Sequence, residues 1–234
     1  MIRFYEENHV FHLTTPNTSY VCGLTDSEWL GHLYYGKKLS DIGGMNLLFR
    51  EREFPFTPRN NYRDKIRFHQ IYPMEYPFSG TGDYREAGIS VQNASGQSGC
   101  ELRYLNHTIY HGKNTDPELP MTRGNEENCD TLEIVLCDTV PGIDVHLYYS
   151  AFQDVDAITR SVRIVNSGKE KLRLTRAMSA VLSLDIEDPE ILTLHGTWGR
   201  ERRIQTQTLK AGSIVTESLR GVTGAEDHPF LGIL

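Results

Sequence analysis

Two stretches of the chain combine the residue types that recognise polar ligands. Residues 72–89 read YPMEYPFSGTGDYREAGI and residues 196–201 read GTWGRE, so both place glycine, charge and aromatic rings between strand-like runs. Glycine lets a backbone approach a ligand closely, charged side chains make directional hydrogen bonds, and aromatic rings stack on flat apolar faces. This combination suits a sugar. An ordinary long turn has the same composition, so neither stretch alone establishes a function.

Paired carboxylates are the next candidates for chemistry. Asp154 with Asp156, and Asp185 with Glu187, are two positions apart, so each pair would share one face of a strand and could perform acid–base work in a cleft. Solvent-exposed turn carboxylates give the same pattern far more often. No G-x-S-x-G nucleophile motif or phosphate-binding glycine motif is present. We therefore assign no catalytic residue from local motifs.

Metal and cofactor signals are also weak. His107 and His111 are four positions apart, which is a helical spacing for metal ligands, but residues 106–112 read as strand and turn. The four cysteines, at positions 22, 100, 129 and 137, form no C-x-x-C pair. We expect no metal, no cofactor and four free thiols.

Composition narrows the class of partner. The net charge is -7, and the one basic cluster, Arg200 with Arg202 and Arg203, is interrupted by Glu201. Nucleic-acid binding needs a concentrated basic surface, so it is not expected. No apolar run approaches the roughly 20 residues that span a bilayer, and the first residues lack the pattern of a secretory signal. The expected location is cytoplasmic, with no membrane contact and a neutral ligand such as a sugar.

The elements that would position these residues are strands, because the hydrophobic period is two through most of the chain. Turn signals such as Pro141-Gly142 and residues 166–169 separate the runs. The predicted strands cover residues 11–13, 19–24, 29–35, 132–138, 145–152, 158–165, 172–181, 204–209 and 213–219. This spacing predicts an all-β fold of antiparallel sheets, a β-sandwich. A helix capped by Thr25 or Asp26 over residues 25–33 is the weaker alternative there.

Residues 50–78 break this rhythm with four prolines, dense charge and several aromatics. Long irregular loops are uncommon and are usually functional or disordered, and the aromatics argue against disorder. We expect this arm to pack on a neighbour or to cover a cleft. A loop folded onto its own domain remains the alternative.

Much of the chain resembles the N-terminal domain of family 36 glycoside hydrolases, the bacterial-type α-galactosidases. The similar segments occur in family order. They are FHLTTPNTSYV, GHLYYGKKL, MEYPFSGTGDYREAGI, LEIVLCDTVPGIDVHLYYSAFQDVDAITRSVRIVNSG, LHGTWGRER and ESLRGVTGAEDHPFLGIL. The resemblance implies a β-supersandwich of the galactose-mutarotase-like type, followed in the family by a (β/α)8 barrel. That barrel carries the two aspartates of a retaining mechanism.

Because this chain ends at Leu234, we expect residues 1–234 to be this domain, truncated at its C-terminal end and without the catalytic barrel. No catalytic residue can therefore be carried over, and the chain alone is expected to be inactive. Residues 40–61 and 221–228 depart from the family pattern. These departures affect the loops rather than the fold.

The resemblance also implies that loops of this domain help to form homo-oligomers and reach an active site in an adjacent subunit. The matching positions lie within residues 41–64 and in the turn at residues 83–85. The substrate-binding candidates are Asp41, Arg52, Asp64, Asp83, Tyr84, Arg85 and Trp198. For Trp198, core packing against the adjacent turn is the alternative, and for the turn at residues 83–85, a structural ion pair.

Three functions follow from these observations. The leading one is the non-catalytic N-terminal domain of a retaining α-galactosidase that acts on raffinose-type oligosaccharides. A freestanding carbohydrate-binding module would instead bind galactosides by itself. An aldose-epimerase-like enzyme would need a histidine acid and a glutamate base across one cleft, for which His195 with Glu201 is the loose candidate.

Overall fold

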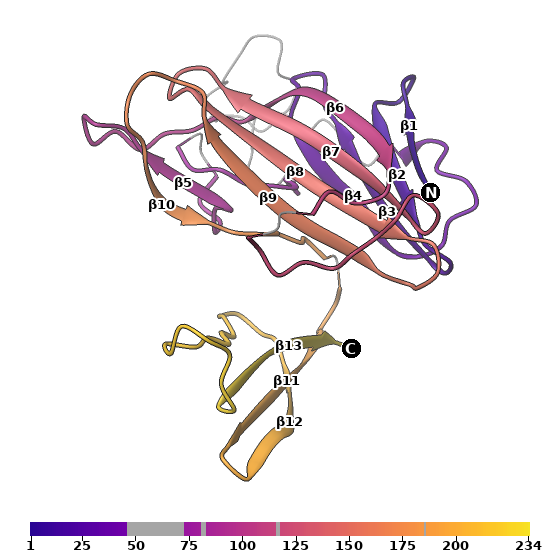
Figure 1. Cartoon of the computed structure of the whole chain (residues 1–234), viewed down its shortest axis with the longest axis vertical. Coiled ribbons are helices and arrows are strands. Elements are labelled where there is room, and N and C mark those ends of the chain that lie inside the picture. Colours follow the sequence, from indigo (N-terminus) through magenta and orange to yellow (C-terminus); the bar gives the residue numbers. More distant parts are fainter. Residues whose placement is uncertain (46–72, 81–82, 116–117, 185) are drawn as a thin grey trace. The chain divides into compact units, whose positions relative to one another are not determined.

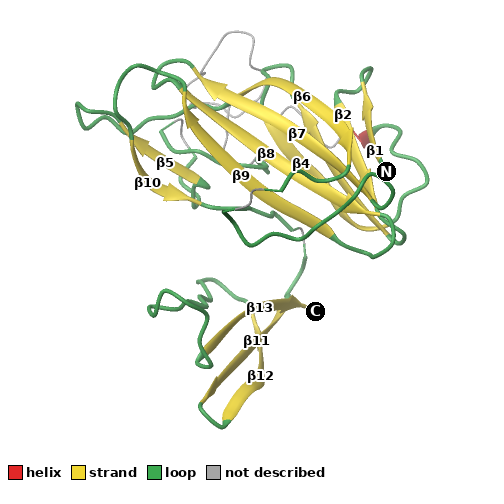
Figure 2. Cartoon of the chain, viewed as in Figure 1, coloured by secondary structure: helices red, strands yellow, loops and turns green. Residues whose placement is uncertain are grey.

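The computed structural model describes residues 1–45, 73–80, 83–115, 118–184 and 186–234. Within these ranges the named elements are all strands, drawn in yellow and joined by loops (Figure 2). None of the described residues forms an α-helix. It divides into two compact units, Met1–Ser183 and Leu184–Leu234. No helix in the described ranges is long and apolar enough to cross a bilayer.

The larger unit is built from two four-stranded antiparallel sheets and a strand pair (Figure 1). The first sheet is a meander of β1 (Ile2–Tyr5), β2 (Val10–Thr14), β3 (Thr18–Leu24) and β4 (Leu30–Lys37). The second is a meander of β6 (Arg103–His111), β7 (Cys129–Asp138), β8 (Ile143–Phe152) and β9 (Ile158–Asn166). The pair consists of β5 (Ile89–Gln92) and β10 (Arg173–Ala177).

One hydrophobic core joins these sheets. Successive side chains of a strand point to opposite faces, and the alternate residues Leu132, Ile134 and Leu136 of β7 are buried in the core. Phe11 of β2 and Ile89 of β5 belong to the same cluster, so both sheets and the strand pair contribute to it. The predicted alternation therefore corresponds to a sandwich with a shared core. The first sheet also buries part of its other face, where Val10, Val21 and Ile42 form a smaller cluster.

The smaller unit is a three-stranded antiparallel sheet. Its order is β12-β11-β13, formed by β11 (Glu190–Thr197), β12 (Arg200–Thr208) and β13 (Asp227–Ile233). Ile191 and Thr193 of β11 are buried, whereas every residue of β12 is exposed. Among these three strands, only the central strand β11 therefore contains buried residues.

The all-β, antiparallel prediction is confirmed, and the runs at 132–138, 145–152 and 158–165 lie within β7, β8 and β9. The prediction of a strand at residues 213–219 is wrong, because these residues form no strand. Of residues 50–78, only 73–78 lie within the described ranges.

The helix considered for residues 25–33 is also wrong. Instead, Thr25 closes a tight turn into β4: its backbone N–H donates to Trp29 O at 3.0 Å, and its hydroxyl accepts from Trp29 N–H at 3.1 Å. Glu28 has a φ of 63° in this turn, which an α-helix does not allow. Local side-chain bonding by threonine therefore stabilises the turn rather than a helix cap.

Candidate functional site

The glycine- and aromatic-rich stretch is described from residue 73. Residues 73–78, here called the strap, form a mostly buried segment rather than an open loop. Met74, Tyr76 and Phe78 are all at most 5% exposed and belong to the core. Met74 forms a β-bridge with Gly31 of β4, and Phe78 forms one with Ile89 of β5. The polar end of the stretch, from Asp83 onward, is therefore held by an apolar anchor.

Glu75 lies within this strap and is 1% exposed. Tyr20 of β3 and Tyr149 of β8 donate their hydroxyls to its carboxylate at 2.5 and 2.7 Å. His32 Nδ1 of β4 lies 2.8 Å from Oε1, and Arg160 of β9 donates to Oε2 at 3.0 Å. This buried polar network joins both large sheets to the strap, and its carboxylate oxygens are held by protein groups.

Burial by itself would raise the pKa of the Glu75 carboxyl. The Arg160 charge and the hydrogen bonds from His32 and Tyr20 together outweigh burial and hold the pKa below its ordinary value. Burial, followed by the nearby Glu75 charge, raises the pKa of both Tyr20 and Tyr149 well above the usual range. The network therefore favours an ionised glutamate and two neutral phenols.

The depressed pKa of Glu75 makes the stability of the larger unit depend on pH. The unfolded chain takes up the proton at a higher pH than the folded chain, so the stabilisation is present above the unfolded pKa and lost as pH falls through the folded one. We expect the free energy of unfolding of the native protein and of Glu75→Gln to converge below about pH 4. Urea unfolding between pH 3 and pH 7 measures this.

Glu217→Gln is the control for this pH series, because Glu217 is exposed. It removes one exposed carboxylate and should change the unfolding free energy at pH 7 by no more than about 0.5 kcal/mol. A difference between native protein and Glu75→Gln that is constant with pH would contradict the assignment of Glu75 as an ionised group.

The turn at Asp83, Tyr84 and Arg85 forms the local ion pair that was the alternative to a sugar-binding role. The Asp83 carboxylate accepts hydrogen bonds from Arg85 N–H and Nε at 3.0 Å each, and Nη2 lies 2.9 Å from Oδ2. The Asp83 side chain is 3% exposed, whereas Tyr84 is 90% exposed. The Tyr84 ring is therefore exposed to solvent, while Asp83 holds Arg85.

The other candidates of the larger unit are dispersed. Asp41 is exposed and its Oδ1 accepts from Gly43 N–H at 2.8 Å, so it closes a short turn. Arg52 and Asp64 lie outside the described residues. Among the described residues, no hydrogen bond or ion pair joins Asp41 to the turn at residues 83–85.

Trp198, in the smaller unit, lies at the tip of the β11–β12 hairpin and is 95% exposed. Gly199 has a φ of 74° and donates its N–H to Glu201 Oε1 at 2.7 Å, and a side chain at Gly196 would overlap the Arg200 carbonyl oxygen. The glycines thus make a tight turn that pushes the indole outward. Trp198 is exposed rather than packed in the core.

The His195 and Glu201 combination for an epimerase-like site is not formed. His195 Nδ1 lies 2.5 Å from Asp227 Oδ1, and its Nε2 lies 2.7 Å from Thr193 Oγ1. Glu201 instead accepts from Gly199 at the hairpin tip. Both imidazole nitrogens therefore have structural partners across β11 and β13.

Of the two carboxylate pairs, Asp154 and Asp156 have structural partners. Asp156 accepts from Thr15 and Asn17, and Asp154 accepts from Asn128 at 3.1 Å. Asp185 lies outside the described residues, so its pairing with Glu187 is not described. Each described aspartate of these pairs therefore stabilises a turn.

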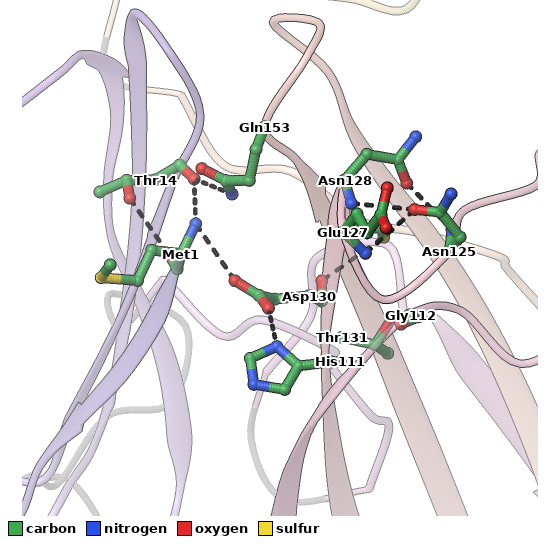
Figure 3. A network of polar contacts seen from close by, with 11 residues as sticks. Met1, Thr14, His111, Gly112, Asn125, Glu127, Asn128, Asp130, Thr131 and Gln153 are labelled. Atoms are coloured by element: carbon green, nitrogen blue, oxygen red, sulfur yellow. Dashed lines mark hydrogen bonds and ion pairs between the residues drawn. The ribbon is translucent and has the colours of Figure 1, made fainter.

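His111 Nδ1 lies 2.7 Å from Asp130, which also pairs with the Met1 ammonium at 3.4 Å (Figure 3). His107 instead lies 2.7 Å from the Tyr104 hydroxyl and against the Phe4 and Phe11 rings. Among the described residues no group of three His, Cys, Asp or Glu side chains could hold a metal ion.

The family model, the similar sequences and the similar structures all indicate the same protein family. Residues 28–234 match the glycosyl hydrolase family 36 N-terminal domain. The α-galactosidase AgaA of Geobacillus stearothermophilus is 35% identical over 234 residues, which is 100% of this chain and 32% of that protein. The bifunctional α-galactosidase/sucrose kinase AgaSK of Mediterraneibacter gnavus is 32% identical over 94% of this chain and 24% of its own length.

Solved structures agree. The family 36 α-galactosidase AgaB from Geobacillus stearothermophilus superposes with a TM-score of 0.91 at 35% identity, over 100% of this chain and 32% of that chain. A variant of AgaA in complex with raffinose gives 0.89 at 36% identity, over 96% of this chain and 31% of that chain. The chain thus spans about a third of the length of the Geobacillus relatives. It belongs to the family of glycosyl hydrolase family 36 N-terminal domains.

Proposed function

We propose that this chain serves as the N-terminal, non-catalytic domain of a retaining α-galactosidase that acts on raffinose-type oligosaccharides. The observation that carries the proposal is the match of the whole chain to α-galactosidases in both sequence and structure. The variant of the relative AgaA that was solved with raffinose supports this substrate class. A cytoplasmic location belongs to the same proposal and is supported by the four free cysteines.

The test is an assay of the natural protein that contains this chain. We expect it to release galactose from raffinose but not from a β-galactoside, with the α-anomer of galactose formed first, as a retaining mechanism requires. Proton NMR of the reaction distinguishes the anomers. Absence of galactose release from raffinose would refute the substrate, and the β-anomer formed first would refute the retaining mechanism.

The purified chain of residues 1–234 should not hydrolyse p-nitrophenyl α-galactoside. Glycoside hydrolysis needs two carboxyl groups that flank the scissile bond. The buried carboxylates of the described residues are Glu75 and Asp83, and both are held in ion pairs. Turnover that copurifies with the chain and follows its concentration would contradict this prediction.

The same proposal assigns two roles to the loops: assembly of homo-oligomers and contribution to a substrate site in an adjacent subunit. The high exposure of Tyr84 and Trp198 supports it, because exposed rings at loop tips can stack on a sugar or pack on a partner. The residues proposed to take part are Asp41, Arg52, Asp64, Asp83, Tyr84, Arg85 and Trp198.

Tyr84 and Asp83 separate a ligand role from a structural one. In the natural protein we expect Tyr84→Ala to leave the melting temperature unchanged and to lower kcat/KM for raffinose, because its ring is 90% exposed. Asp83→Ala should destabilise the fold by about 1–2 kcal/mol, since it leaves the Arg85 guanidinium without this carboxylate. Calorimetry and raffinose kinetics on both variants measure this.

The matched control is Tyr35→Ala, which removes a half-exposed tyrosine of β4 outside the proposed loops. Its kcat/KM should equal that of the native protein in the folded fraction. Unchanged kinetics for Tyr84→Ala would show that the exposed ring has no part in substrate binding.

A further inference from the structure

The outward face of the second sheet holds a pocket of about 430 Å³. This volume lies within the usual range of small-molecule sites. Residues from all four strands of the sheet and from the segment that follows β6 line it. Its polar and charged lining groups include Tyr110, Lys113, Thr131, Tyr148, Ser150 and Arg163.

Strand register explains why these polar groups share one surface. Tyr110 of β6 is opposite Thr131 of β7, and Thr131 is opposite Ser150 of β8. Their sequence neighbours Leu132 and Tyr149 are buried in the core, so this row must face the other way. The result is a continuous polar row across three strands.

Hydrogen bonds hold the pocket walls in place. Thr131 Oγ1 donates to Gly112 O at 2.7 Å and lies 2.9 Å from Ser150 Oγ. Lys113 Nζ donates to Thr159 Oγ1 of β9 at 2.9 Å. Because these contacts link the segment after β6 to the strands, the polar groups are preorganised and a ligand does not have to order them.

The pocket is locally basic although the chain is acidic. Lys113 and Arg163 line it, and none of its described lining residues is acidic, against a net charge of -7 for the chain. Glu133, which accepts from the hydroxyl of the lining residue Tyr148 at 2.9 Å, leaves the two cations in excess by one charge. Burial lowers the pKa of Lys113, which shows that part of its hydration is lost. A partly dehydrated ammonium gains from an anionic ligand that restores its charge-assisted hydrogen bonds.

The Tyr110 hydroxyl is a second reason to place a polar ligand here. It is buried and makes no hydrogen bond to the described residues. Most buried polar side-chain atoms in proteins have a hydrogen-bond partner, so an unpaired one indicates a site for a water, an ion or a ligand group.

We propose that this pocket is a binding site for a small phosphorylated sugar. Lys113 and Arg163 hold the phosphate, while Tyr110 and Ser150 bind hydroxyls of the sugar. Neutral sugars lack the group that matches the two cations, and inorganic phosphate lacks the hydroxyls that match the polar row. The site therefore requires both halves of the ligand.

Isothermal titration calorimetry of the purified chain tests this with three probes: galactose 6-phosphate, galactose and inorganic phosphate. We expect saturable one-to-one binding of galactose 6-phosphate, at least about tenfold tighter than that of either simpler probe. No saturable binding, or equal affinity for galactose or for phosphate alone, would overturn the proposal.

Two variants locate the binding. Arg163→Gln changes an exposed side chain and should weaken galactose 6-phosphate roughly 10- to 100-fold, the effect of losing one charge-assisted hydrogen bond. Tyr110→Phe should also weaken it while leaving the melting temperature unchanged or higher, because it removes a buried hydroxyl without a partner.

The matched control is Arg173→Gln, an exposed arginine of β10 that does not line the pocket. It should bind galactose 6-phosphate as the native chain does. Binding that is unaffected by Arg163→Gln, or weakened equally by Arg173→Gln, would place the ligand elsewhere and refute the site.

Discussion

Arg160→Met should lower the free energy of unfolding of the larger unit by about 3–5 kcal/mol, because it leaves the buried Glu75 carboxylate without its cation. The Arg160 side chain is 12% exposed and that of Glu75 is 0% exposed. Besides the carboxylate, the guanidinium donates to Val181 O at 2.5 Å. It also lies over the Tyr149 ring at 4.8 Å, so its removal leaves several groups unpaired. Urea unfolding followed by intrinsic fluorescence at pH 7 measures the loss.

Arg176→Met is the matched control, since Arg176 pairs with Glu86 at the surface and both side chains are exposed. Surface pairs of this kind contribute about 0–1 kcal/mol. The double variant Glu75→Gln with Arg160→Met should lose less than the sum of the two single losses, because it leaves neither charge buried alone. If Arg160→Met costs no more than Arg176→Met, the network does not hold the sheets together.

This network could be predicted only in part from the sequence. In ITRSVRIV, the alternation that sends Ile158, Val162 and Ile164 toward the core also sends Arg160 there, and an inward arginine needs a buried partner. Nothing local identifies that partner as Glu75. The glutamate comes from a segment whose prolines and glycines read as a loop, so its burial depends on tertiary packing.

The strands, too, were predictable where the signal is local and not where it depends on tertiary contacts. β7 to β9 were predictable because clear turns separate runs that are rich in β-branched and aromatic residues and have a period close to two. β12 reads RERRIQTQT and is exposed throughout, so only part of it was predicted, and β13 carries Pro229 without clear alternation. Their pairing with β11 comes from long-range hydrogen bonding, which composition does not reveal.

For the candidate residues, the sequence could indicate only local structure. The ion pair of Asp83 with Arg85 joins residues two apart, and the exposed Trp198 follows from the glycines on either side of it. The sequence did not predict the pocket on the second sheet. Lys113 and Arg163 are far apart in the sequence and line the same pocket only because of the pairing of β6 to β9. Residues that strand pairing brings together leave no signal of spacing in the sequence.

The second large effect is expected at Gly142, in the turn between β7 and β8. Gly142→Ala should destabilise the larger unit by about 2–4 kcal/mol, from a strained backbone and an overlap together. Its φ is 71°, and an added Cβ would lie 2.6 Å from the Cα of Gly168. Gly142 O also accepts from the N–H groups of Ser167 and Gly168 at 2.9 Å each, so the two turns cannot separate without losing these bonds.

Two controls divide this effect into its parts. Gly96→Ala tests strain alone, because Gly96 has a φ of 82° and its nearest neighbour to an added Cβ is 3.9 Å away. Gly168→Ala tests crowding alone, since its Cβ would come no closer than 3.2 Å to Pro141 O. Each should cost about 1 kcal/mol, measured by urea unfolding alongside Gly142→Ala. A loss at Gly142 no greater than at Gly96 would mean that the two turns do not restrain each other, and that the β7–β8 and β9–β10 connections stabilise the sheet independently.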